Sequence, residues 1–172
     1  MKVNLIQVKF LPAPDAVITK LNNCGHAMLE YPHHYRVAAS AGSEGDVNLT
    51  SSELDPILSA PPAEFDGPGD RWSPETLLVA AVADCFILSF RGIAKASRLP
   101  WLSLECEVEG TLARIEGTTK FTDFKVEATL HVTRGTNEEK AQRILEKAEA
   151  ACLITNSLSG LTHLTAVVSV KS

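Results

Sequence analysis

The sequence predicts an α+β domain, and three features lead to that class. A long apolar helix is predicted over residues 74–97, two segments that alternate polar and apolar residues follow it, and an amphipathic helix comes next. Strands and helices therefore occur in blocks rather than in the regular alternation of an α/β protein. With 172 residues, 45% hydrophobic and 22% charged, the chain has the composition of a globular domain with a real hydrophobic core.

The domain is expected over residues 35–172, after an N-terminal segment, residues 1–34, to which no role is assigned. Residues 35–49 predict a hairpin of two short strands, because residues 42–45 between them form a glycine-containing turn sequence. Residues 55–71 are rich in proline and glycine and therefore predict a loop.

A strong helix start follows this loop. The Ser73 oxygen can accept hydrogen bonds from free amides, Pro74 suits the first helical position, and Glu75 suits the positive end of the helix dipole. The helix is expected to end before Pro100, which excludes further continuation. Residues 77–83 are apolar on every face, which predicts a helix buried in the core.

The second half of the chain predicts three more strands and a second helix. Residues 102–115 and 121–133 alternate as half-buried strands do, with a turn at residues 116–119. A capping-box sequence at residues 136–139 then opens the helix. Its apolar residues at helical spacing are Ala141, Ile144, Leu145, Ala148 and Ala151. Residues 163–170 alternate again and predict the last strand.

Charge and hydropathy exclude several kinds of partner. The formal net charge is −5 and no lysine- or arginine-rich run occurs, which argues against nucleic-acid binding. The longest apolar runs, such as residues 77–83, are far shorter than the ~20 residues of a membrane span. Residues 1–10 alternate polar and apolar residues, and Lys9 interrupts any signal-peptide core. The expected location is the cytoplasm, with no membrane partner.

The chain has four cysteines: Cys24, Cys85, Cys106 and Cys152. In a reducing compartment they are not expected to form structural disulfides, and they lack the C-x-x-C pairs of a structural zinc site. The residues near Cys24, namely His26 and the pair His33-His34, match no standard metal-site spacing. We therefore expect surface histidines and no bound metal.

Cys85 lies about three turns into the apolar helix, where a cysteine is ordinarily a small packing residue. It is roughly 18 Å along the axis from Ser73, so the helix dipole, which fades within the first turn, cannot lower its pKa. A reactive Cys85 therefore requires a nearby cation. Cys152, at or just after the end of the second helix, is equally ambiguous when considered alone.

Two motifs resolve this ambiguity through a family resemblance. Residues 73–86, S-P-E-T-L-L-V-A-A-V-A-D-C-F, resemble the [NS]-P-E-x-L-x-x-A-x-x-A-x-C-F motif of the OsmC/Ohr family, the osmotically inducible protein C and organic hydroperoxide resistance proteins. Residues 151–158, A-C-L-I-T-N-S-L, are similar to its C-P-x-[ST]-x-x-L segment. The order of elements also agrees, so the resemblance covers about residues 35–170.

The resemblance implies an OsmC-like fold, with antiparallel sheets, a long buried central helix and an intertwined homodimer. It also implies a peroxidase without a cofactor, in which the Cys85 thiolate attacks an organic hydroperoxide and Cys152 resolves the product to a disulfide. A dithiol, dihydrolipoamide in characterised members, would restore the thiols. The residues around Cys85 are apolar, which is compatible with organic peroxides but equally typical of a plain core.

The resemblance further implies that Glu75 pairs with an arginine that stabilises the thiolate. A straight helix places Glu75 and Cys85 about 15 Å apart, so a kink, a bridging arginine or a partner subunit must bring them together. Glu75 is otherwise a glutamate favoured at a helix start. The family's arginine in the first hairpin turn is missing here. Arg71 or Arg36 could substitute for it. We favour Arg71, because the loop that it ends leads directly to Glu75. Arg91 lies six residues after Cys85 and on a straight helix points away from that cysteine.

Two further departures concern the cysteine motifs. Asp84 stands where a small neutral residue is usual, and Leu153 replaces the proline after Cys152. An acid beside the thiol opposes its ionisation unless the acid is paired. Cys106, in an alternating strand, is interpreted as structural. The alternatives to a peroxidase are a non-enzymatic relative that binds an apolar ligand or senses redox state slowly, and a purely structural dimer module.

Overall fold

The computed structural model describes residues 31–171, and its fold lies in the compact unit that begins at Arg36. The elements in chain order are β1 (Ala38–Ser40), β2 (Val47–Thr50), β3 (Ile57–Ser59), the 3-10 helix η1 (Ala63–Phe65), α1 (Pro74–Ala96), β4 (Ser103–Ile115), β5 (Thr118–Thr133), α2 (Glu138–Ala150), the 3-10 helix η2 (Thr155–Ser157) and β6 (Leu161–Lys171). Two three-stranded sheets and two α-helices confirm the predicted α+β class.

The first sheet consists of β1, β2 and β3, all antiparallel. The predicted hairpin is confirmed as β1 and β2, and Gly45 in its turn has a φ of 88°, which glycine adopts without strain. β3 lies inside the segment predicted to be a loop, and that prediction was wrong for these three residues. The strand is too short to show an alternating pattern in the sequence. It forms because it pairs with β2 on one side and because its residue Ser59 makes an isolated bridge to Trp72.

The second sheet has the order β4-β5-β6. β4 and β5 form an antiparallel hairpin whose turn residues Glu116 and Gly117 both have positive φ, as a two-residue loop of type I′ requires. β6 pairs with β5 in parallel, so this sheet is mixed rather than antiparallel throughout as expected. The cause is the connection between them: α2 carries the chain back along the sheet before β6 begins, as in other parallel crossovers.

The helix α1 begins as predicted. Ser73 accepts a hydrogen bond from the Thr76 amide at 3.2 Å, and the Thr76 hydroxyl accepts one from the Ser73 amide at 2.8 Å. Its fully buried residues are spaced every four positions on one face: Val82, Phe86, Phe90 and Ala94. The helix was expected to be buried all round. Instead its other faces are partly or fully exposed in this chain, and Leu88 has 51% of its surface accessible.

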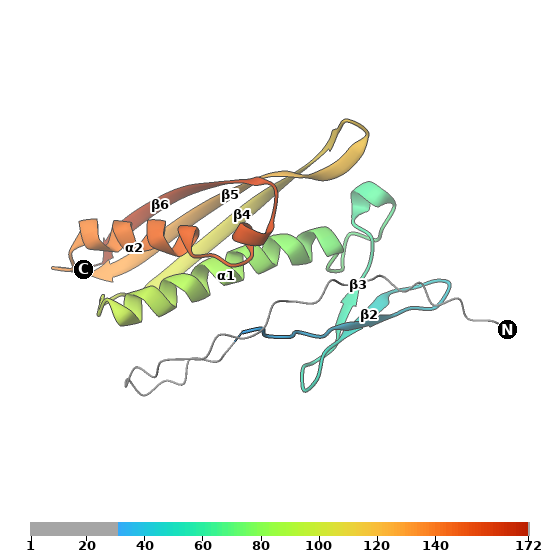
Figure 1. Cartoon of the computed structure of the whole chain (residues 1–172), viewed down its shortest axis with the longest axis horizontal. Coiled ribbons are helices and arrows are strands. Elements are labelled where there is room, and N and C mark those ends of the chain that lie inside the picture. Colours follow the sequence, from blue (N-terminus) through green and yellow to red (C-terminus); the bar gives the residue numbers. More distant parts are fainter. Residues whose placement is uncertain (1–30, 172) are drawn as a thin grey trace, which may run out of the picture. The chain divides into compact units, whose positions relative to one another are not determined.

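The helix α2 begins one residue later than the capping-box prediction, because Asn137 rather than Thr136 is the N-cap and accepts a hydrogen bond from the Lys140 amide at 2.8 Å. The predicted apolar face is confirmed for Ala141, Ile144, Leu145 and Ala148, all of which are buried. Ala151, which ends the helix, is exposed. α1 and α2 lie on the same face of the β4-β5-β6 sheet and enclose one core with it (Figure 1).

By length and composition, α1 would also be able to cross a membrane. The core helix of a soluble protein meets the same criterion. The sequence argument against a membrane span considered only uninterrupted apolar runs, and it does not hold for the complete helix α1. Its buried stripe packs against the sheet and α2, as expected of a core helix.

Candidate active site

The fold brings Cys85 and Cys152 together. Cys85 precedes the buried Phe86 by one position on α1, so it lies at the edge of the helix face that packs into the core and is partly exposed. Cys152 follows α2 directly and is buried, with 1% of its surface accessible. Because α1 and α2 pack against each other, the two thiols lie close enough to influence each other's pKa.

The surroundings of Cys85 favour its thiolate. Burial has the largest single influence on this thiol and opposes ionisation. The backbone amide of Ile154 and the Cys152 thiol act in the opposite direction through hydrogen bonds, followed by the amide of Leu153 and the side chain of Ser89. Together these hydrogen bonds outweigh burial, and the pKa of Cys85 is lower than that of an ordinary cysteine.

The surroundings of Cys152 favour its protonated form. Burial raises the pKa of the Cys152 thiol most. Hydrogen bonds from the side chain and backbone of Thr155 lower it, whereas the hydrogen bond with Cys85 and the charge there raise it, and the net change is upward. The pair is therefore polarised: the pKa of Cys85 is lowered and that of Cys152 is raised, so Cys85 ionises first while Cys152 stays protonated.

The sequence had led us to expect a nearby cation as the activator of Cys85. Among the principal influences on this thiol, within the part of the chain that the structure describes, none is a positive charge. The donors are instead the amides of Leu153 and Ile154, which begin the turn leading into η2. Sequence reasoning missed them because a backbone amide carries no residue signature. The one available signal was Leu153, which has the N–H group that a proline at this position would lack.

A cavity of about 370 Å³ opens beside Cys85. One wall is a stripe of α1 and the other is the turn after Cys152. The lining residues are Ala81, Asp84, Cys85, Leu88, Ser89, Leu153 and Ile154. The cavity is therefore mostly apolar, and the thiol faces it directly.

Glu75 lies elsewhere, in a larger cavity of about 810 Å³ between the N-terminal half of α1 and the β4-β5 hairpin. Its Oε2 atom is buried and has no hydrogen-bond partner within residues 31–171. Cys106 lines the same cavity. Burial, followed by the charge of Cys152, raises the pKa of the Cys106 thiol to about 11, so this cysteine is a poor nucleophile at neutral pH.

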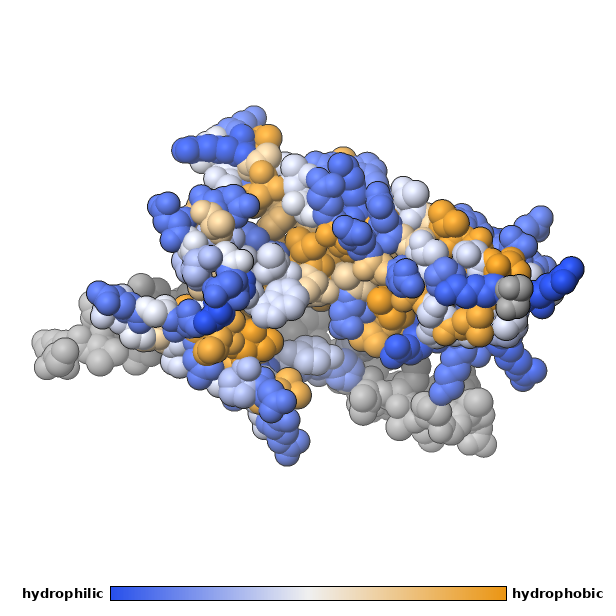
Figure 2. Space-filling model, turned by 180° about the vertical axis from the view of Figure 1, so that it is seen from behind, coloured by the Kyte–Doolittle hydropathy of each residue, from blue (hydrophilic) through white to orange (hydrophobic). Residues whose placement is uncertain are grey.

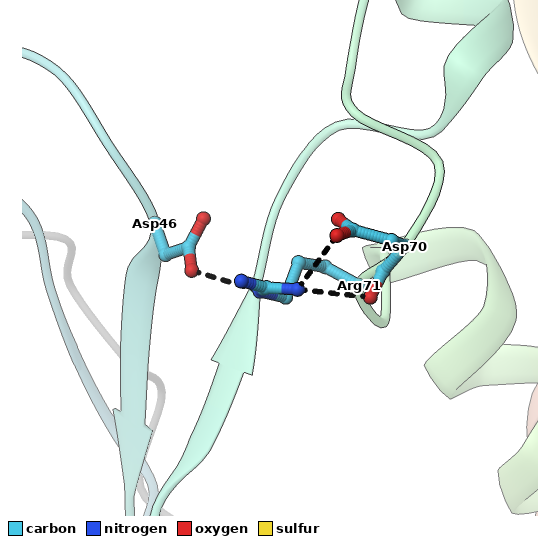
Figure 3. Close-up of polar contacts among 3 residues, drawn as sticks. All are labelled: Asp46, Asp70 and Arg71. Carbon is cyan, nitrogen blue, oxygen red and sulfur yellow. Dashed lines mark hydrogen bonds and ion pairs between the residues drawn. The ribbon is translucent and has the colours of Figure 1, made fainter.

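Arg71 does not reach Glu75 or Cys85 in this chain. Its Nε atom donates to Asp46 at 3.0 Å, and its Nη1 atom pairs with Asp70 at 3.0 Å (Figure 3). These contacts tie the start of β2 to the residues just before α1. Of the four predicted site residues, the structure brings together Cys85 and Cys152 and leaves Arg71 and Glu75 apart from them.

Of the possible metal ligands near the N-terminus, Cys24 and His26 lie outside the described residues. His33 and His34 are described and exposed, as expected of surface histidines. Over residues 31–171, no group of three or more potential ligand side chains could hold a metal ion.

The fold and the site together define a class: an α+β protein in which a helix of the core presents one thiol to a second thiol at the end of the next helix. Comparison with known families gives the same result, because residues 67–166 match the family model described as OsmC-like protein. The chain belongs to the OsmC family. Its structural relatives show that the OsmC-like fold extends well beyond the matched residues.

An OsmC-like protein of unknown function from Vibrio cholerae has a TM-score of 0.72 at 18% identity, covering 79% of this chain and 100% of the other. An organic hydroperoxide resistance protein from Elizabethkingia anophelis has a TM-score of 0.67 at 20% identity, covering 83% of this chain and 100% of the other. At these identities the likeness concerns the fold alone. The uncharacterised protein YmaD of Bacillus subtilis (strain 168) is 27% identical over 144 residues, which are 81% of this chain and 95% of YmaD.

Proposed function

We propose that this protein is a cysteine-based peroxidase that reduces organic hydroperoxides, with Cys85 as the attacking residue and Cys152 as the resolving residue. The observation that carries the proposal is the polarised thiol pair, in which hydrogen bonds lower the pKa of Cys85 and burial raises the pKa of Cys152. Attack on a peroxide requires a thiolate, and resolution requires a second thiol in contact with the first.

The reaction proceeds in three steps. The Cys85 thiolate attacks the distal peroxide oxygen, the O–O bond breaks, and the alkoxide takes a proton from water and leaves as an alcohol. Cys85 is now a sulfenic acid. The Cys152 sulfur attacks the Cys85 sulfur, the S–OH bond breaks, and water leaves as the disulfide forms. A dithiol reductant such as dihydrolipoamide then reduces the disulfide and becomes a disulfide itself.

The geometry supports each role. Cys85 faces a cavity with mostly apolar walls, which suits the organic part of a hydroperoxide. Cys152 is shielded from solvent, so external oxidants reach Cys85 first. Fold relatives that include organic hydroperoxide resistance proteins from Legionella pneumophila and Elizabethkingia anophelis are consistent with this activity.

The protein is proposed to act as a homodimer in the cytoplasm. Large hydrophobic residues are exposed on the first sheet and before α1, among them Ile57, Leu58, Phe65 and Trp72. Figure 2 shows hydrophobic surface exposed between hydrophilic regions on one face of the protein. Exposed apolar area of this kind is typical of a protein interface, and a partner subunit would also be the source of groups near Glu75 or Cys85 that this chain does not supply.

The test is stoichiometric titration of the reduced protein with cumene hydroperoxide. We expect one peroxide consumed per subunit and a Cys85–Cys152 disulfide in the mass spectrum of the digested protein. Cys85→Ser should abolish rapid consumption. Cys152→Ser should still react once but accumulate a sulfenic acid that a dimedone probe traps. Consumption by Cys85→Ser at the parent rate would contradict the proposal.

A second candidate, a slow redox sensor, is favoured by two observations. Arg71 is held by Asp46 and Asp70, and an acid rather than a base lines the Cys85 cavity. A thiol without a neighbouring guanidinium group can still be oxidised by peroxide, but its reaction is slow. The rate of peroxide reduction distinguishes the two candidates. A rate with a dithiol that is orders of magnitude above that of free cysteine at the same pH supports the enzyme. A rate comparable to that of free cysteine supports the sensor.

A further inference from the structure

The cavity beside Cys85 contains one charged side chain. Asp84 precedes the cysteine on α1 and lines the same cavity, and its side chain is exposed. Within the described part of the chain, Asp84 is the only lining residue with an ionisable side chain besides Cys85 itself. It forms no ion pair with any residue between 31 and 171.

The nearest cation on the same side of α1 is Arg91. Seven residues are nearly two helical turns, so Arg91 points in about the same direction as Asp84 but lies about 10 Å further along the axis. It does not line the cavity. That separation is about one Debye length at 0.1 M salt, so Arg91 only weakly offsets the charge of Asp84.

We propose that Asp84 makes this site selective by charge, so that Cys85 reacts with uncharged or cationic reagents in preference to anionic ones. The inference deepens the proposed function, on which its statement about substrates rests. The preferred peroxide has an apolar body, which contacts Leu88, Leu153 and Ile154, and carries no carboxylate near the hydroperoxide.

The physical basis is repulsion between like charges at the mouth of the cavity. An anionic reagent approaching the thiolate must come within several ångströms of the Asp84 carboxylate. At such distances one unit charge near a protein surface changes the probability of approach by about three- to tenfold, and salt reduces the effect. The repulsion is independent of the peroxide chemistry, so it also acts on any other reagent for the thiol.

The first test uses two alkylating reagents of nearly equal shape, iodoacetamide and iodoacetate, in competition for Cys85. Both react with the same thiolate, so a change in the pKa of Cys85 cancels in the ratio of the two products. We expect Asp84→Asn to raise the share of carboxymethyl over carbamidomethyl product at Cys85 by about three- to tenfold at low salt, and by less at high salt. Mass spectrometry of the digested protein gives the ratio.

The matched control is Glu127→Gln, which removes the same charge from an exposed position on β5 outside the cavity. It should shift the ratio much less than Asp84→Asn does. A ratio unchanged by Asp84→Asn, or shifted equally by both variants, would overturn the proposal.

The second test compares a short 3-hydroperoxy carboxylic acid, whose carboxylate lies within a few bonds of the hydroperoxide, with its methyl ester. Asp84→Asn should raise kcat/KM for the acid relative to the ester by a similar factor. If no peroxide is turned over but the alkylation ratio shifts, the proposed peroxidase is wrong and charge selection by Asp84 stands. If peroxide is turned over but neither ratio shifts, charge selection is wrong and the peroxidase stands.

Discussion

Cys85 and Cys152 lie close enough for each thiol to shift the pKa of the other: Cys152 lowers that of Cys85, and Cys85 raises that of Cys152. The pKa of Cys85 is lowered mainly by groups that follow α2, with a smaller contribution from Ser89 on α1, whereas burial is the main cause that raises the pKa of Cys152. The site is therefore a product of the packing of α1 against α2, and changes on one helix should alter the chemistry of the other.

Cys152→Ala should raise the pKa of Cys85. The substitution removes the S–H donor that stabilises the thiolate, while burial still opposes ionisation. The pH midpoint for alkylation of Cys85 by iodoacetamide should therefore move upward relative to the parent. Mass spectrometry of the Cys85 peptide gives this midpoint without a contribution from the other cysteines. An unchanged midpoint would show that the Cys152 thiol does not stabilise the Cys85 thiolate and that the amides of Leu153 and Ile154 are sufficient.

Leu153→Pro and Leu153→Ala should differ in their effect on Cys85. Both shorten the exposed side chain, which has 72% of its surface accessible, but only proline removes the backbone N–H that lowers the pKa of Cys85. The thiolate midpoint of Leu153→Pro should exceed that of Leu153→Ala. Circular dichroism of both variants controls for a disturbed turn. Equal midpoints in two folded variants would mean that this amide does not act on the sulfur.

Cys106→Val should reduce the loss of stability at alkaline pH. The folded-state pKa of Cys106 is about 11, above its ordinary value of 9.0, so folding favours the protonated thiol. Its contribution is fully present below pH 9.0 and is lost as pH rises toward 11, at most about 2 kcal/mol. Urea unfolding between these pH values should show a shallower decline for the variant than for the parent. Parallel declines would contradict the assignment.

Phe90→Ala should lower the free energy of unfolding by about 3–5 kcal/mol, because it removes a fully buried aromatic side chain. Phe90 also makes an edge-to-face contact with Trp101, with ring centroids 5.3 Å apart. The matched control is Leu102→Ala, at an exposed position, which should cost about 0.5 kcal/mol or less. Chemical denaturation at one protein concentration provides both values. Similar losses would mean that Leu102 is covered in solution.

Local signals in the sequence were sufficient for much of the fold. The cap at Ser73 and the turn at Glu116-Gly117 depend on neighbouring residues only, and both were predicted. The strand β3 and the parallel pairing of β6 depend on distant partners, and neither was foreseen. The helix α1 was wrongly expected to be buried on every side. Its apolar composition indicates that burial is favourable, but it does not show which sides of the helix the rest of this chain covers.

The candidate site likewise contains features that the sequence predicted and features that it did not. Cys85 and Cys152 were identified by motifs, and the structure places them in contact. The amides of Leu153 and Ile154 were missed because their action depends on the direction of the backbone. Arg71 was favoured for its closeness in sequence to Glu75, but the nearer acids Asp46 and Asp70 bind it instead.

The position of Cys152 on the connection between α2 and β6 has a further consequence for the proposed catalytic cycle. A Cys85–Cys152 disulfide would link the central helix to this crossover and close a loop of about 67 residues. In the chain-entropy view, closing a loop of that length disfavours the unfolded ensemble by about 4 kcal/mol. Each turnover would then pass through a state of greater thermal resistance, and the melting temperature would report how much of the enzyme is waiting for its reductant.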